Sequence, residues 1–403
     1  MVKLLDPRTP VIIGVGQVAN HPDRGDDEVE PVELVARAAR AAEADSGATG
    51  VLAVADSIRV VKMLSWRYRD PGALVGALVG ASPRQSLYST DGGQTPQALL
   101  NRTALDIAAG DLDVALLCGG ETWRTRQRYR HAGEIPPWTP LDDTTPTAES
   151  FGAELDMVDA AELARGLLLP VQFYALFEVA LRAAAGRTPD EHRAHLGRLW
   201  SRFSEIAATN PNAWSRKAMT AEEVVDPTAD NRLIGYPYTL VMNSNNHVEQ
   251  AAALLLCSVE KAEALGVPRD RWVFPLAGAE ANDHAHVSHR GDLCTSPAIR
   301  AAGRVLFAAA GVGADELGPV DLYSCFPSAV QIAAAELGLG TDRDLTVTGG
   351  MGIAGGPWNN YATHGIATMV GRLREDPGAV GLCTANGGLT TKHALGLYST
   401  EPP

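Results

Sequence analysis

The chain has 403 residues, and its 34 basic and 48 acidic side chains give a formal net charge of −14 at pH 7. This charge repels phosphate polyanions and argues against a nucleic-acid-binding surface. Hydrophobic residues make up 45% of the chain and the mean hydropathy is −0.05, values typical of a soluble globular protein. The length exceeds that of one simple core, so we expect two packed halves or two domains.

The cysteines and the amino terminus indicate a cytoplasmic protein. The five cysteines are scattered, odd in number and without a CxxC pair, which is the pattern of neither a disulfide framework nor a zinc site. We therefore expect reduced thiols. The first apolar run, at 11–15, is far shorter than a signal-peptide core or a membrane span.

Short apolar runs alternate with helical patterns along the first part of the chain. We expect buried strands at 11–15 and 57–61 and an alanine-rich helix at 32–44. A second helix is expected from Thr95 to about Ala109, with Thr95 as its cap, followed by a strand that ends in two glycines. This alternation predicts an α/β fold with a largely parallel or mixed sheet.

One unit of the sequence occurs twice. A glycine-rich turn, a helix, an acidic turn and a strand ending in Leu-Cys before glycines are found in 89–120 and again in 348–388. Two similar halves are the natural interpretation, and chance similarity between βα units is the alternative.

The segment 123–228 has a different character. It begins with arginines at every second position from Arg124 to Arg130, continues with a stretch rich in proline and threonine, and contains helical runs at 169–185 and 191–208. We interpret it as an inserted helical lid. Its arginines are either a solvated surface or contacts to the phosphates of a charged ligand.

Four blocks in a fixed order carry a resemblance to a known family. They are GDLDVALLCGGETW (110–123), 237–267, DLYSCFPSAV (321–330) and 349–388. With them the chain resembles the thiolase superfamily, nearest to the thiolase-like proteins around the sterol-carrier-type thiolases, over almost its whole length.

The resemblance implies a fold and a ligand. It implies a thiolase fold, five αβαβα layers made of two similar βαβαβαββ halves. The N-terminal half would be 1–122 with 229–268, the inserted loop domain 123–228, and the C-terminal half 269–403. It also implies an acyl-CoA thioester as substrate, no tightly bound cofactor, and a homodimer.

The family's nucleophile is a cysteine at the N-terminus of a buried helix, where the helix dipole and peptide N–H groups stabilise a thiolate. The matching helix here begins at Thr95, so the position of that cysteine falls at Gly92 or Gly93, and no cysteine precedes Cys118. The nearby hydroxyls of Ser89, Thr90 and Thr95 are expected to be caps and turn residues rather than nucleophiles.

Further family motifs give the other candidate catalytic residues, which are Tyr323, Tyr361, His364 and Cys383. Tyr323 begins the Tyr-Ser-Cys-Phe match, and it is either an acid or base with a lowered pKa or a hydrogen-bonded core residue. Cys325 in that motif is interpreted as packing. The Gly-His-Pro motif aligns with 355–357, where Gly356 takes the place of histidine. Lys392 and His393 either reach the pocket rim or cover surface.

Glycine turns and cations complete the expected site. Backbone N–H groups for a thioester oxygen are expected at Gly92, Gly93, Gly355, Gly356 and Gly387. Coenzyme A contacts are expected from Arg124, Arg126, Arg216, Lys217 and His247. His284, His286 and His289 have a metal-ligand spacing, but nothing places Asp283 or Asp292 on their face, so no metal is expected.

Three functions remain open at this stage. The first is carbon–carbon bond cleavage or formation on a CoA thioester, of retro-aldol type, with Tyr323 and without a cysteine nucleophile. The second is an acetyl-CoA C-acyltransferase with a substitute thiol such as Cys383, and the third is a non-catalytic CoA-binding or scaffold protein. Related chains often carry, or pair with, a small OB-fold domain, so the resemblance also implies a separate OB-fold subunit.

Overall fold

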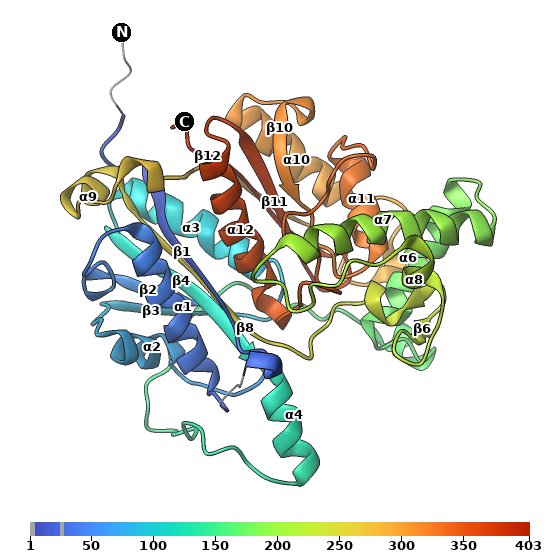
Figure 1. Cartoon of the computed structure of the whole chain (residues 1–403), viewed down its shortest axis with the longest axis horizontal. Helices are drawn as coiled ribbons and strands as arrows, with labels where there is room; N and C mark the ends of the chain where they lie inside the picture. The colour runs from blue at the N-terminus through green and yellow to red at the C-terminus, as the bar shows by residue number, and fades with distance from the viewer. Residues whose placement is uncertain (1–4, 25–27) are drawn as a thin grey trace.

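Two β-sheets form the frame of the computed structural model, which describes residues 5–24 and 28–403 (Figure 1). The larger sheet has the order β1-β8-β4-β2-β3-β5. Its strands are β1 (Pro10–Ala19), β2 (Ser57–Val60), β3 (Gln85–Ser89), β4 (Val114–Thr122), β5 (Glu149–Phe151) and β8 (Glu249–Ser258). β2 to β5 run parallel, whereas β8 is antiparallel to both β1 and β4, so the sheet is mixed as expected.

The second sheet comes from the C-terminal part of the chain. Its strands are β9 (Phe274–Asn282), β10 (Leu317–Asp321), β11 (Val380–Gly387) and β12 (Lys392–Ser399), in the order β10-β11-β12-β9. β10 and β11 are parallel, and β12 is antiparallel to both of its neighbours.

Helices fill the space between the sheets and cover their outer faces. α3 (Thr95–Ala109) and α12 (Tyr361–Glu375) contact each other and strands of both sheets. α1 (Pro31–Ser46) and α2 (Pro71–Val79) pack on the outside of the first sheet, and α10 (Pro297–Ala310) and α11 (Pro327–Glu336) lie outside the second (Figure 1). The expected succession of five αβαβα layers is confirmed.

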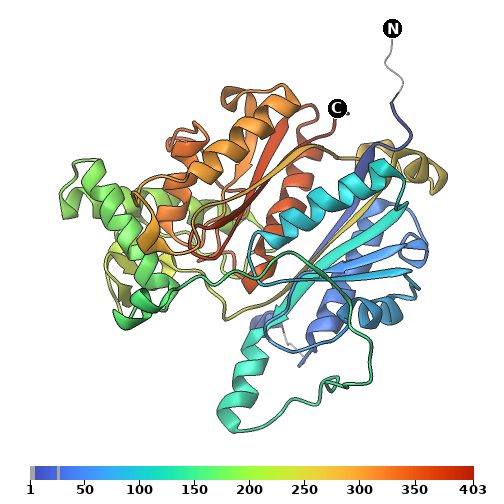
Figure 2. The same ribbon diagram turned by 180° about the vertical axis from the view of Figure 1, so that it is seen from behind.

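The parts of the segment 123–228 pack at two separate places on the molecule. α4 (Trp123–Ala132) continues from the end of β4, and β5 then joins the edge of the first sheet beside β3. The helices α6 (Pro170–Ala184) and α7 (Pro189–Thr209) pack instead against α11, far from α4 (Figure 2). A cluster around Phe173, Phe177, Trp200 and Phe203 therefore belongs to the same core as the second sheet.

The remaining elements are short. They are α5 (Ala160–Ala164), α8 (Ala221–Val225), α9 (Val259–Ala264), the paired strands β6 (Leu233–Gly235) and β7 (Tyr238–Thr239), and the 3-10 turns η1 (Pro22–Arg24), η2 (Leu52–Val54), η3 (Leu240–Met242), η4 (Arg269–Arg271), η5 (Val287–His289), η6 (Ala314–Glu316) and η7 (Trp358–Asn360). In the described part of the chain, no helix has both the length and the apolar composition to cross a membrane.

The two halves differ in one strand. The first half follows the expected βαβαβαββ order, but the second has no strand between α11 and α12 within the described residues. There the segment 345–350 gives its backbone N–H groups to side chains: Val347 donates to Asp321 Oδ1, Gly349 to Thr346 Oγ1 and Gly350 to Thr348 Oγ1. Because these bonds take donors that a sheet ladder would use, the segment forms no strand.

The prediction of Thr95 as a helix cap is wrong. Gln94 is the N-cap and makes no side-chain capping bond, while Thr95 lies inside α3, where its Oγ1 donates to the carbonyl of Gly92. The hydroxyl thus closes the glycine turn that precedes the helix.

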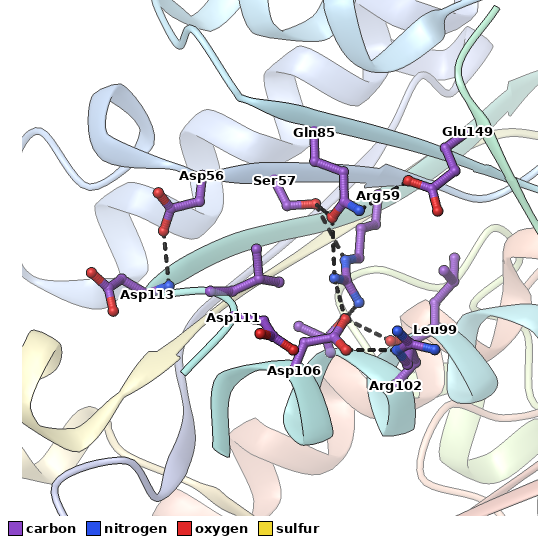
Figure 3. Close-up of polar contacts among 12 residues, drawn as sticks. Asp56, Ser57, Arg59, Gln85, Leu99, Arg102, Asp106, Asp111, Asp113 and Glu149 are labelled. Atoms are coloured by element: carbon purple, nitrogen blue, oxygen red, sulfur yellow. Dashed lines mark hydrogen bonds and ion pairs between the residues drawn. The ribbon is translucent and has the colours of Figure 1, made fainter. Parts of the chain in front are cut away.

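A buried ion pair fastens α3 to the first sheet. Arg59 on β2 is 1% exposed, and its guanidinium lies 2.5 Å from the carboxylate of Asp106 on α3. It also donates to Thr103 Oγ1, and to Ser57 Oγ as Figure 3 shows. Arg102 reaches the same carboxylate from the solvent side. Since an unpaired buried charge is costly, this network fixes where α3 lies on the sheet.

We predict that Asp106→Ala lowers the free energy of unfolding by about 3–5 kcal/mol, because it leaves the Arg59 charge buried and unpaired. Arg102→Ala, which removes only the exposed partner, is expected to cost less than about 1 kcal/mol. Urea unfolding of both variants measures the difference. Equal losses would show that the buried pair does not hold α3.

Candidate active site

A cavity of about 790 Å³ lies where the N-terminus of α3 meets the second half of the chain. Its wall is built from the turn before α3, the loops that follow β10 and β11, η7, and two parts of the segment between β5 and β8. Apolar side chains dominate the wall, with a few polar groups among them, which is the usual composition of a small-molecule site.

The turn before α3 has no room for a side chain at position 93. A Cβ placed on Gly93 would lie 2.0 Å from the hydroxyl oxygen of Tyr323 and 2.5 Å from the carbonyl oxygen of Asn386. At Gly92 the φ angle is +150°, and a Cβ there would lie 2.9 Å from Lys392 Nζ. The Tyr323 hydroxyl therefore occupies the space that a side chain at the start of α3 would need.

Tyr323 is held by its backbone and by a neighbouring ring. Its N–H donates to Thr384 Oγ1, and its ring meets the ring of Tyr361 edge-on at 5.5 Å. Burial raises the pKa of Tyr323 well above its usual value, so the phenol keeps its proton. A lowered pKa, the condition for a base, is thus contradicted, and the hydroxyl is suited to donate a hydrogen bond.

The cavity contains a thiol, but not the predicted one. Cys383 is 3% exposed in the middle of β11, packs in the core between the sheets, and its pKa is raised well above the usual value by burial. Cys325 lines the cavity with Sγ 3.9 Å from Asn386 Nδ2, and burial raises its pKa to about 11. The thiol in a position to replace the family's nucleophile is therefore Cys325 and not Cys383. The sequence motif had indicated only a packing role for Cys325.

Tyr361 and His364 point away from the cavity. The Tyr361 hydroxyl lies 2.7 Å from Thr348 Oγ1 and 3.3 Å from Asp321 Oδ2, so this side chain supports the ring of Tyr323 from behind. His364 Nδ1 lies 2.9 Å from Gln17 Oε1 on β1, and burial lowers its pKa from 6.5 to about 3. His364 is thus a neutral core histidine, and the prediction that it is catalytic is not supported.

Two of the expected N–H donors are already engaged. Gly92 donates to Asn359 Oδ1 at 3.1 Å, and Gly356 donates to the carbonyl of Asn245 at 2.9 Å. Gly355 and Gly356 lie outside the cavity wall, where a Cβ on Gly355 would meet Gln250 and one on Gly356 would meet Ser244. Of the predicted glycines, Gly92, Gly93 and Gly387 line the cavity.

The cations predicted for coenzyme A lie outside the cavity wall. Arg126 stacks over Trp66 at 5.5 Å, Arg216 reaches the carbonyl of Ala208, and Lys217 pairs with Glu223. His247 is exposed, and its pKa is lowered by partial burial and then by the charge of Arg124. None of these five residues faces the ligand space described above.

Two other cations line the cavity instead. Arg232 is exposed and contributes to the wall, although nothing in its sequence context singled it out. Lys392, which the sequence analysis left undecided, is 7% exposed, and its Nζ donates to the carbonyl of Asp91 at 2.6 Å. Burial lowers the pKa of Lys392 below its usual value.

Trp358 is a wall residue that sequence reasoning missed. Its φ of +47° is unusual for a bulky side chain, and its ring meets Trp123 at 5.0 Å. Backbone of this kind concentrates at functional sites. The sequence feature that could have identified Trp358 as a site residue is its position directly after the Gly-Gly-Pro match at 355–357.

The comparisons with known proteins define the class. No protein-family model matches the chain. The monomeric SCP2-thiolase-like protein type 1 from Mycobacterium smegmatis matches with a TM-score of 0.84 and 34% identity, over 99% of this chain and 79% of that chain. An Ltp2-ChsH2(DUF35) aldolase matches with a TM-score of 0.72 and 20% identity, over 97% and 98% of the two chains. The dimeric peroxisomal thiolase of Saccharomyces cerevisiae matches with 0.68 and 13%, over 98% of each.

The fold is therefore the thiolase fold, which the two more distant structures share. The chain belongs to the SCP2-thiolase-like proteins of the thiolase superfamily, which confirms the resemblance found in the sequence.

The buried histidine makes stability depend on pH. Because the folded-state pKa of His364 is about 3 and its ordinary value is 6.5, the unfolded chain binds a proton in this range that the folded chain does not. Stability from this group is present above pH 6.5 and is lost toward pH 3, by about 1.4 kcal/mol per pH unit. We predict that His364→Asn flattens the decline in unfolding free energy between pH 6 and about pH 4. His131→Asn, at an exposed site on α4, is the control, and an unchanged slope in His364→Asn would contradict the prediction.

Proposed function

We propose that the chain processes acyl-CoA thioesters by breaking or forming a carbon–carbon bond through a thioester enolate, as in a retro-aldol reaction. The observation that carries this proposal is the protonated Tyr323 hydroxyl in the space beside Gly93, at the N-terminus of α3. A hydrogen-bond donor stands there, and positions 92 and 93 hold no thiol.

The chemistry needs a proton acceptor for the β-hydroxyl and donors for the enolate oxygen. The Tyr323 hydroxyl, beside the positive end of the α3 dipole, donates to the developing enolate oxygen. Lys392, whose pKa burial lowers, is the acceptor we assign. In this scheme Lys392 acts as the neutral amine: the β-hydroxyl proton moves to the Nζ lone pair, the oxygen forms the carbonyl of the leaving product, and the Cα–Cβ bond breaks so that its electron pair forms the enolate. The carbonyl product leaves, and the enolate carbon takes a proton from the ammonium or from water.

The rest of the cavity suits a thioester with an anionic carrier. Arg232 is the wall cation that we assign to a CoA phosphate. The apolar wall residues Leu155, Met157, Phe326 and Met351 favour an acyl chain. No tightly bound cofactor enters this scheme.

An acyltransferase is the second candidate, because Cys325 presents a thiol to the same cavity. Its pKa of about 11 leaves little thiolate at neutral pH, which is why we rank it second. A non-catalytic CoA-binding protein remains as an outcome of the tests.

We predict that Tyr323→Phe lowers turnover of a β-hydroxyacyl-CoA about 100-fold, since the loss of one hydrogen-bond donor to a developing oxyanion costs a factor of that order. The affinity for CoA, measured by calorimetry, stays within twofold of the unaltered chain. Products are followed by liquid chromatography and mass spectrometry, and Tyr129→Phe on the surface of α4 is the matched control.

Intact-protein mass spectrometry after incubation with acyl-CoA separates the candidates. The retro-aldol proposal expects no acyl adduct, with full turnover in Cys325→Ala. A stable adduct that Cys325→Ala abolishes would favour the acyltransferase instead. CoA binding without turnover would leave the non-catalytic protein.

We also propose self-association as a dimer and a separate small OB-fold partner subunit, in the cytoplasm. The matched aldolase contains ChsH2(DUF35) beside Ltp2, and the yeast thiolase is dimeric, whereas the mycobacterial relative is monomeric. The five free cysteines are compatible with a reducing compartment.

Size-exclusion chromatography with light scattering tests both associations. We expect the chain alone to elute at twice its 42.5 kDa mass, and to gain mass when co-expressed with the small product of a neighbouring gene. A 42.5 kDa particle would contradict self-association, and an unchanged mass on co-expression would contradict the partner.

A further inference from the structure

A second group of chemically active side chains lies outside the cavity wall. Asp159 precedes α5, and His286 and His289 stand at either end of the turn η5. Asp159 Oδ2 lies 3.1 Å from His289 Nε2 and 4.0 Å from His286 Nδ1, and the three atoms all lie within 4.8 Å of one another. In a tetrahedral zinc site with ligands at about 2.0–2.1 Å, the ligand atoms are about 3.3–3.5 Å apart. The observed separations bracket that value.

One buried carboxylate holds the two segments of this group together. Glu162 is 3% exposed; its Oε2 accepts from the N–H of Asp159 at 2.9 Å, and its Oε1 accepts from the N–H of Ser288 at 2.7 Å. Ser288 lies between the two histidines. The three side chains are therefore brought together by backbone contacts that do not depend on an ion.

Asp159 turns one carboxylate oxygen toward the histidines. Its Oδ1 accepts from the N–H of Glu162 at 2.8 Å, which directs Oδ2 toward the imidazoles. The His289 side chain is 59% exposed and that of His286 26%, so an ion has access from solvent. Two imidazoles and a carboxylate form a donor set typical of zinc and similar divalent ions, with water in the fourth position.

We propose that Asp159, His286 and His289 bind one divalent transition-metal ion, with Zn²⁺ as the reference ion. The ion links two parts of the fold. The residues just before Asp159, including Leu155 and Met157, are in the cavity wall, whereas His286 and His289 belong to the segment after β9. A bound ion thus stabilises one wall of the cavity and takes no part in the reaction.

The sequence predicts no metal here because the carboxylates nearest to the histidines along the chain are those of Asp283 and Asp292. Asp283 instead accepts from Ser296 and Ala298, and Asp292 accepts from Cys294 and Thr295, so both are used locally. The carboxylate at the histidines comes from a distant part of the chain. No local pattern pointed to it.

The test uses the full chain, stripped with EDTA and dialysed, and then titrated with ZnCl₂ by calorimetry. We expect one ion per chain by elemental analysis and a rise in thermal midpoint with zinc. His289→Ala and Asp159→Asn should weaken binding at least tenfold, and His284→Ala, in the same segment but outside the group, should leave it unchanged.

Cysteine binding is the main competing source of zinc affinity. Cys294→Ser controls for the partly exposed thiol nearby in sequence, and the absorption spectrum with Co²⁺ should lack a thiolate charge-transfer band. An unchanged zinc affinity in His289→Ala, loss of binding in Cys294→Ser, or no binding at millimolar zinc would overturn the proposal. Circular dichroism of the variants, whose histidines are partly exposed, checks that they fold.

Discussion

The architecture depends on the burial of α3 and α12 between the two sheets. A helix enclosed in this way must either be apolar or satisfy each polar group inside the protein. α3 contributes Leu99, Leu100 and Ile107, which pack in one cluster with Ile366 and Val370 of α12. The buried ion pair of Arg59 with Asp106, together with the hydrogen bonds from Arg59 to Thr103 and Ser57, fixes α3 on its sheet. Since α3 is fixed, the glycine turn before it is fixed too, and this turn forms part of the cavity.

Desolvation also sets the chemistry of that cavity. The same burial raises the pKa of Tyr323 and Cys325 and lowers that of Lys392, so each group is moved toward its neutral form. A neutral phenol suits hydrogen bonding to an enolate, and a lysine whose pKa is lowered suits the role of proton acceptor. They do not suit a thiolate nucleophile, which needs a depressed cysteine pKa. The environment therefore favours the retro-aldol proposal over the acyltransferase.

The site is assembled from segments that have different local structure. Tyr323 follows a strand, Gly93 precedes a helix, and Trp358 lies in a 3-10 turn with a left-handed backbone. In the second half, Asp321 and threonine hydroxyls accept hydrogen bonds from backbone N–H groups of the segment 345–350, which therefore forms no strand. Met351, directly after this segment, lies in the cavity wall. The two halves thus differ where the second half builds the site.

The sequence by itself determined the layered α/β fold, the two halves and the absence of a cysteine at positions 92 and 93. The α/β alternation follows from hydrophobic periodicity and from glycine and proline positions, and the two halves follow from a repeated unit, all of which act locally or along the chain. The five layers are what the resemblance to the thiolase superfamily implied. Only the tertiary structure decided that Tyr323 and Cys325 face the cavity while Tyr361, His364 and Cys383 do not. It also placed Lys392 and Arg232 in the wall and Asp159 beside two histidines. The physical reason is that the direction of a side chain, and the charge it keeps when buried, depend on neighbours that are distant in sequence.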